Sequence, residues 1–218
     1  MALLGKVDWE SFLSPNSEIP QDIFFLVKGG DCKCSKFGAH RVLLAGISPV
    51  FRRMFFGPMA ETKEEMEVKD TSPEAFRAMI NYIYTRHPHD VLKEIGCPET
   101  LLELFALADM YDILELKTKI SKSLQEFEIN HANLTYTATV ASSYKGLFAD
   151  ISTELLMLCL KFYLGLDATD KDALLESSDG ILQELMEVGR STLQFPGNSF
   201  CIITLTSRFC RLGHPSLL

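Results

Sequence analysis

The chain has 218 residues, of which 47% are hydrophobic and 23% are charged. This length and composition predict a sizeable core in one or two compact units and exclude disorder over most of the chain. Lys and Arg total 21, against 29 for Asp and Glu. Because this acidic balance comes without a local basic patch, it repels nucleic-acid phosphates and anionic lipid, and we expect no direct nucleic-acid partner.

The N-terminus and the cysteines indicate the compartment. The first residues, MALLGKVDWESF, contain no long apolar run behind a basic flank. No window approaches the roughly 20 apolar residues that span a bilayer. We therefore expect no secretory signal and no membrane partner. The six cysteines are scattered through a chain that is large enough to fold without disulfides. This predicts a reducing setting, cytoplasmic or nuclear.

The first part of the chain predicts a hairpin followed by two helices. The β-prone run from Asp22 to Val27 precedes a glycine-containing turn, and a returning strand is expected over 32–37. Helical spacing begins over 39–45. Ser48-Pro49 then supplies a capping hydroxyl and a proline at the first helical position, and this second helix is expected to end at Gly57-Pro58.

The next segments predict one short strand and then an amphipathic helix. Alternation over Glu65–Lys69 favours a half-exposed strand. Ser72-Pro73 repeats the capping device at the start of the clearest apolar stripe in the chain. This stripe consists of Phe76, Met79, Ile80, Ile83 and Tyr84. The region 87–96, which follows the helix, is expected to be a loop with a short helical piece.

From Pro98 onward the pattern is helical only. Apolar stripes predict two helices up to Phe127 and two further helices, one through Leu134, Ala138 and Ala141 and one through Leu155, Leu158, Cys159 and Phe162. A hairpin-led segment followed by helices predicts an α+β domain up to about Phe127 and a separate helical region after it. The uncharged, β-prone run over 200–206 allows no confident prediction.

Catalytic and metal-binding patterns are scarce in this sequence. It contains no P-loop, no nucleophile elbow, no His-Glu-x-x-His and no dinucleotide fingerprint. Cys32-x-Cys34 and His87-Pro88-His89 lack the further ligands of a metal site. His40 would be a general base only beside a nucleophile, and its apolar neighbours favour a partly buried ring that hydrogen-bonds locally. We expect no enzyme, no catalytic residue, no metal and no cofactor.

Several of these segments, taken together, resemble a known family. They are Asp22–Val27 (DIFFLV), Phe37–Ala45 (FGAHRVLLA), Ser48–Phe51 (SPVF) with Met54-Phe55, Ala75-Phe76, and Tyr82–Thr85 (YIYT). From about Trp9 to Phe127 the chain resembles the BTB (POZ) domain. The resemblance implies an α+β fold, in which a small sheet is flanked by helices, and a role in protein–protein interaction.

The resemblance also implies a division of the chain. Residues 1–20 correspond to an N-terminal dimer arm and 21–127 to the BTB/POZ domain. Residues 128–187 resemble the opening of the BACK helices that follow this domain in many adaptors, particularly those without kelch repeats. A full BACK region runs further than this chain, so the tail over 188–218 departs from the pattern. Truncation and alternative splicing are both open as explanations.

Proteins of this family act as dimeric adaptors that bind the N-terminal domain of cullin-3 and deliver substrates to a RING ubiquitin ligase. The family's contact motif is a hydrophobic residue, any residue and a glutamate, and Met59-Ala60-Glu61 matches it. A plain surface loop is the alternative for this tripeptide. Phe55 and Tyr111 are predicted to join the cullin contact. The implied partners are cullin-3, an unidentified substrate protein, and a second copy or another BTB protein.

The dimer interface is predicted from two sets of residues. Trp9, Phe12 and Leu13 are apolar and precede the first core strand, as a dimer arm would, although they could equally pack on their own subunit. The family keeps an acid at the start of the first strand and a base after the helix histidine, both near the dimer axis. Asp22 and Arg41 take these positions, and a charge pair between them is expected. A dimerising scaffold without ligase function, able to titrate longer relatives, is the second hypothesis.

Overall fold

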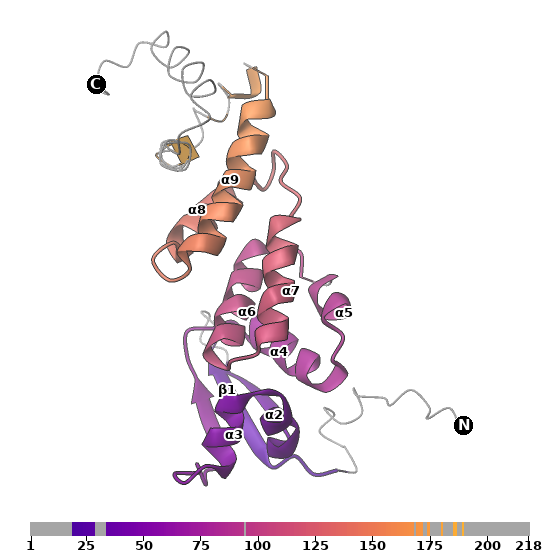
Figure 1. Cartoon of the computed structure of the whole chain (residues 1–218). Coiled ribbons are helices and arrows are strands. Elements are labelled where there is room, and N and C mark those ends of the chain that lie inside the picture. The colour runs from indigo at the N-terminus through magenta and orange to yellow at the C-terminus, as the bar shows by residue number, and fades with distance from the viewer. Residues whose placement is uncertain are drawn as a thin grey trace. The chain divides into compact units, whose positions relative to one another are not determined.

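The computed structural model describes residues 19–28, 34–93, 95–167 and 169–171, with isolated positions between 174 and 189 and without the side chains of 88–90. The chain divides into two compact units, Met1–Glu126 and Phe127–Leu218. Figure 1 shows the elements of both units.

A three-stranded sheet forms one layer of the first unit (Figure 1). Its central strand β1 (Ile23–Lys28) is antiparallel to β2 (Cys34–Ala39) and parallel to β3 (Glu65–Val68). Every second side chain of β1 is buried, because successive residues of a strand point to opposite faces. The predicted hairpin and third strand are confirmed. β2 extends two residues beyond the predicted end at 37.

Two helices follow the hairpin. The second of them and the helix after β3 are each capped by a serine. α2 (Arg41–Ile47) begins two residues later than predicted, because His40 keeps an extended backbone in front of it. α3 (Pro49–Phe56) and α4 (Pro73–Thr85) begin at prolines. The side chains of Ser48 and Ser72 accept the hydrogen bond of the amide three residues ahead in each case. The two predicted caps are therefore confirmed.

The rest of the first unit is helical. The predicted loop over 87–96 contains the short helix α5 (Pro88–Lys93), and α6 (Pro98–Met110) and α7 (Leu114–Gln125) follow. α4 packs against α6, and α6 packs against α7. Among the residues described, no helix of the protein is both long and apolar enough to cross a membrane.

Aromatic rings connect the sheet to the helices in the core of the first unit. The ring of Phe25 on β1 lies 5.9 Å from that of Phe51 on α3 and 5.1 Å from that of Phe76 on α4. Phe51 also stacks on Tyr111, just after α6, at 4.2 Å. Aromatic pairs prefer ring separations of about 4.5–7 Å and tilted or offset geometry. The core therefore holds α3 against β1 and against the residue that follows α6, and it holds β1 against α4.

The second unit contains α8 (Leu134–Tyr144) and α9 (Ala149–Gly165), which pack on each other. Both predicted helices are confirmed. The predicted stripe of α9 is partly wrong, because Leu158 and Phe162 are only half-buried while Leu156 and Leu160 are buried. A helix that is apolar on most of its surface carries little periodic signal, so only packing selects its buried face. The run over 200–206 lies outside the described residues.

Candidate functional site

A loop over residues 57–64, called the 57–64 loop below, joins α3 to β3 and carries the predicted contact motif. Gly57 ends α3, and a Cβ atom there would lie 2.3 Å from the carbonyl oxygen of Arg53, so the chain turns closely over the helix end. Met59 is 96% exposed, whereas Glu61 is half-buried. The loop therefore presents a large apolar side chain to solvent beside a partly enclosed carboxylate.

Hydrogen bonds from both sides hold the 57–64 loop in place. The guanidinium of Arg41 donates to the carbonyl oxygens of Glu61, at 3.2 Å, and Lys63, at 2.6 Å. The backbone N–H of Glu61 donates to the carbonyl of Met54 at 2.7 Å. The Lys63 N–H donates to Oε1 of Glu61 at 3.2 Å. Met59 thus stands on backbone that is tied to both α2 and α3.

The predicted pair of Asp22 and Arg41 makes a different contact from the one expected. Oδ1 of Asp22 accepts a hydrogen bond from the backbone N–H of Arg41 at 2.7 Å, while the guanidinium goes to the 57–64 loop. That guanidinium also lies 5.4 Å from the centre of the Phe55 ring. Arg41 therefore links the start of α2 to the contact motif, a role that the sequence did not indicate.

Phe55 and Tyr111, the other predicted cullin contacts, are buried, with 5% and 7% of their surfaces exposed. The Phe51 ring stacks between them, 5.6 Å from Phe55 and 4.2 Å from Tyr111. Burial also raises the pKa of the Tyr111 hydroxyl. In this structure the two side chains support α3 and offer a partner little surface. Their contact with cullin stays a prediction.

Two exposed apolar residues were not among the predicted dimer contacts, one on α2 and one before β1. Trp9, Phe12 and Leu13 lie outside the described residues. Val42 on α2 is 67% exposed, and Ile19 before β1 is exposed as well. Sequence reasoning missed Val42, because it begins an apolar run whose later members, Leu44 and Ala45, are core residues. The available signal was the buried Leu44 two positions later, because residues i and i+2 lie on nearly opposite sides of a helix.

His40 is buried and hydrogen-bonded, as predicted, but its main partner comes from a distant helix. The Tyr84 hydroxyl accepts from the His40 backbone N–H at 2.9 Å and lies 2.7 Å from Nδ1. The Tyr84 hydroxyl is therefore placed to donate its proton to Nδ1. The imidazole proton is then on Nε2, which lies 3.3 Å from the carbonyl oxygen of Ile19. Burial raises the pKa of Tyr84 to about 12.

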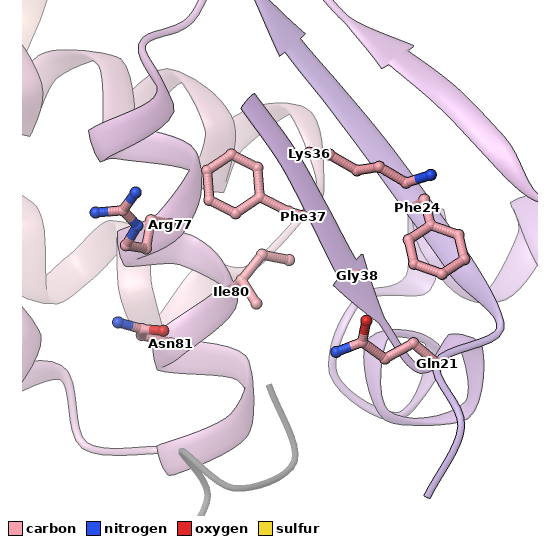
Figure 2. Close-up of a pocket in the computed structure, with 8 residues that line it drawn as sticks. All are labelled: Gln21, Phe24, Lys36, Phe37, Gly38, Arg77, Ile80 and Asn81. Atoms are coloured by element: carbon pink, nitrogen blue, oxygen red, sulfur yellow. The ribbon is translucent and has the colours of Figure 1, made fainter. Parts of the chain in front are cut away.

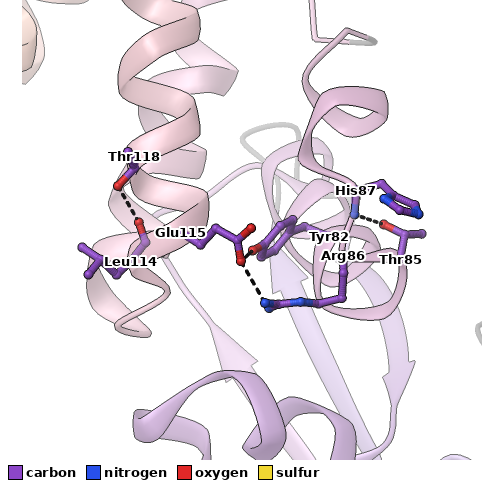
Figure 3. A network of polar contacts seen from close by, with 7 residues as sticks. All are labelled: Tyr82, Thr85, Arg86, His87, Leu114, Glu115 and Thr118. Atoms are coloured by element: carbon purple, nitrogen blue, oxygen red, sulfur yellow. Dashed lines mark hydrogen bonds and ion pairs between the residues drawn. The ribbon is translucent and has the colours of Figure 1, made fainter.

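A second polar network ties α4 to α7 (Figure 3). Oε2 of Glu115 accepts from the Tyr82 hydroxyl at 2.9 Å and from the guanidinium of Arg86 at 2.8 Å. Arg86 ends α4 in the left-handed region at φ 57°, which turns its side chain back toward the helix. Burial and the Glu115 carboxylate raise the pKa of Tyr82 to about 12. The network is structural.

The described residues contain no group of three or more His, Cys, Asp and Glu side chains that could hold a metal ion. Cys34 is exposed at the start of β2. Cys32 and the side chain of His89 lie outside the described part of the structure. That Cys32-x-Cys34 and His87-Pro88-His89 form no metal site therefore stays a prediction.

The first unit is a small α+β domain that presents one exposed methionine, Met59, on a loop held by α2 and α3. The model of the BTB/POZ domain family matches residues 15–128, which is more than half of the chain. The chain belongs to this family, and its fold is the BTB fold, with a small three-stranded sheet and many helices.

Curated relatives are similar over the same region. "BTB/POZ and MATH domain-containing protein 3" of Arabidopsis thaliana is 32% identical over 154 residues, which cover 67% of this chain and 35% of that protein. "BTB/POZ domain-containing protein 9" of Homo sapiens is 34% identical over 150 residues, which cover 65% and 23%. The chain therefore aligns with about a quarter to a third of the length of these relatives. Among solved structures, the BTB domain of zebrafish PATZ1 is 23% identical, with a TM-score of 0.37, over 49% of this chain and 76% of that one.

Proposed function

We propose that the protein is a dimeric substrate adaptor that binds the N-terminal domain of cullin-3 and brings a substrate protein to a RING ubiquitin ligase. The observation that carries this proposal is the 57–64 loop, where Met59 is almost completely exposed while the backbone at Glu61, two residues later, is held by Arg41 and Met54. We place the protein in the cytoplasm or the nucleus.

Physical chemistry supports a docking role for this loop. Methionine is flexible and polarisable, so it fills irregular apolar pockets on a partner. A carboxylate adds a directional, charge-assisted hydrogen bond, and the Lys63 amide already orients that of Glu61. Because the backbone is held before binding, little conformational entropy is lost when a partner docks.

The test is a binding measurement on matched variants. We expect Met59→Ala combined with Glu61→Ala to weaken the affinity for the cullin-3 N-terminal domain by about 2 kcal/mol or more, roughly 30-fold, in calorimetry. Glu64→Ala, at an exposed residue of the same loop, is the matched control and should bind as the unaltered protein does. Unchanged binding by the double variant would rule out this loop as the contact.

Self-association is the second part of the proposal, and the exposed side chain of Val42 on α2 supports it. A β-branched apolar residue in this position gains from burial against a second copy. We expect Val42→Glu to convert dimers to monomers in analytical ultracentrifugation. Leu114→Glu, at an equally exposed aliphatic residue of α7, should leave the dimer intact.

A dimerising scaffold without ligase function is the alternative, and it is supported by the exposed Val42 on α2, whose burial against a second copy would not require a cullin contact. In that case the protein would pair with itself or with longer BTB proteins, and in such a mixed dimer it would occupy the dimerisation surface of the longer protein. Dimerisation together with no detectable affinity for any cullin N-terminal domain would favour this scaffold over the adaptor.

A further inference from the structure

A hollow of about 400 Å³ lies between the sheet and α4 (Figure 2). Its volume falls within the roughly 300–1,000 Å³ that is usual for ligand pockets. Residues of β1, β2 and α4 line it. The 57–64 loop leads into β3, at the opposite edge of the sheet from β2, so the hollow is separate from the proposed cullin contact.

β2 carries a glycine, Gly38, where it lines the hollow. Gly38 is the register partner of Phe24 and so presents no side chain opposite that ring. A Cβ atom on Gly38 would lie 1.6 Å from Oε1 of Gln21, so the glutamine side chain packs directly against the glycine. Any larger residue at 38 would displace Gln21 and reshape the space.

The wall that α4 supplies is charged and polar at its rim. Arg77, Ile80 and Asn81 have the i, i+3, i+4 spacing that places them on one helix face. Arg77 is exposed, and its guanidinium carbon lies 5.7 Å from the centre of the Phe37 ring. Within the part of the chain that is described, this guanidinium forms no ion pair.

Lys36 on β2 supplies the second positive charge. Its ammonium lies 4.4 Å from the centre of the Phe24 ring and forms an ion pair with Glu65 at 2.5 Å. The lining thus contains two cations and no carboxylate, on a chain whose net charge is −8. Because Glu65 pairs with Lys36, Arg77 is the cation of this lining that is left to attract an anionic partner.

The strand beside the hollow is also open to pairing. β2 ends the sheet order β2-β1-β3, so none of the described strands pairs with its outer edge. An edge strand has unpaired backbone N–H and C=O groups, which can take up an extended segment of another protein. Side chains of such a segment alternate, so that every second one would face the hollow.

We propose that this hollow is a docking site for an extended acidic segment of a partner protein. The segment lies along β2, places a carboxylate on Arg77, and packs an apolar side chain against the ring of Phe37. The apolar floor and the strand edge favour a protein segment over a free anion, because a small anion would use the cation and leave both features without a contact.

Selection of random seven-residue peptides by phage display on the full chain tests the proposal. We expect the selected peptides to carry Asp or Glu within two residues of an aromatic or branched aliphatic residue. Synthetic copies should bind in fluorescence anisotropy. Arg77→Glu should weaken that binding at least about tenfold, since charged hydrogen bonds are strong and the reversed charge repels. Asn81→Trp, which fills the hollow from a half-buried position, should weaken it as well.

Three controls separate the outcomes. Lys119→Glu makes the same charge change at an exposed position of α7 and should leave peptide binding unchanged. Met59→Ala with Glu61→Ala should also leave it unchanged, which keeps this test independent of the cullin proposal. Circular dichroism shows whether each variant is folded. Selection of no peptide, selection of uncharged or basic peptides, or equal binding to the Arg77→Glu variant would overturn the proposal.

The chain's own first residues are the competing occupant. A synthetic peptide of residues 1–18 contains Asp8, Glu10 and Glu18 together with apolar residues. We expect it to bind more weakly than the selected peptides. If it binds more tightly than they do, and Arg77→Glu abolishes that binding, the hollow belongs to the N-terminal segment and the proposal of an outside partner fails.

Discussion

Replacement of Ser48 by alanine is expected to destabilise the first unit strongly. Ser48 is completely buried. Its Oγ accepts the hydrogen bond of the Phe51 N–H at 3.1 Å, which caps α3, and donates to the carbonyl oxygen of Tyr111 at 2.5 Å. Alanine would remove both bonds at once. It would leave an amide and a carbonyl without partners in a place that water does not reach.

The magnitude follows from these two losses. Loss of a serine cap costs about 1 kcal/mol, and a buried carbonyl left unsatisfied costs about 1–3 kcal/mol more. We therefore expect Ser48→Ala to lower the free energy of unfolding by about 2–4 kcal/mol. Ser72 is the matched control, because it caps α4 in the same Ser-Pro arrangement. Its hydroxyl donates to the half-buried carboxylate of Glu103, which water can solvate, so Ser72→Ala should cost only about 1 kcal/mol.

Urea unfolding, followed by far-UV circular dichroism, measures both variants. The expected result is a clearly lower midpoint for Ser48→Ala than for Ser72→Ala, with similar slopes. Hydrogen exchange should locate the loss in α3 for the first variant and in α4 for the second. Equal losses in the two variants would refute the argument that the buried Tyr111 carbonyl, rather than the cap alone, makes Ser48 important.

Three further predictions concern the polar contacts. Arg41→Met removes both guanidinium bonds to the 57–64 loop, and we expect the loop amides to exchange with deuterium at least about tenfold faster while α2 stays helical; unchanged exchange would contradict this. Burial raises the pKa of Tyr84 to about 12, so its contribution to stability is complete below the unfolded pKa of about 10 and is lost as the pH rises toward 12. Tyr84→Phe should flatten the fall of unfolding free energy measured above pH 10, and an equally steep fall would refute this. Glu115→Gln breaks a half-exposed ion pair with Arg86, and urea unfolding should detect a loss below about 1 kcal/mol; a larger loss would indicate a more buried network.

Much of the local structure was predictable from the residues alone. Helical and strand periodicity predicted the hairpin, the third strand and the succession of helices, because each pattern reports which side chains share a face over a few residues. The two Ser-Pro caps were predictable for the same reason, since the capping hydroxyl and the amide that it accepts from are three residues apart. The exposed motif containing Met59 was found from its order and spacing within the family pattern.

Contacts between distant residues needed the tertiary structure. The sequence placed Arg41 beside Asp22 as a charge pair, but its guanidinium reaches Lys63, 22 positions away. His40 was expected to bond locally, yet its partner Tyr84 is 44 positions away.

Sequence periodicity also left open which apolar residues face inward. Tyr111 was predicted as a contact and is buried, whereas Val42 belongs to an apolar run and is exposed. The two Ser-Pro caps are alike in sequence, and only packing determines that one hydroxyl meets a buried carbonyl and the other a half-buried carboxylate. Propensity and capping act over three or four residues, so the sequence by itself determined the elements and their order. Burial and long-range hydrogen bonds depend on which surfaces meet, and packing alone decided that the 57–64 loop is held by Arg41 and that a hollow lies beside β2.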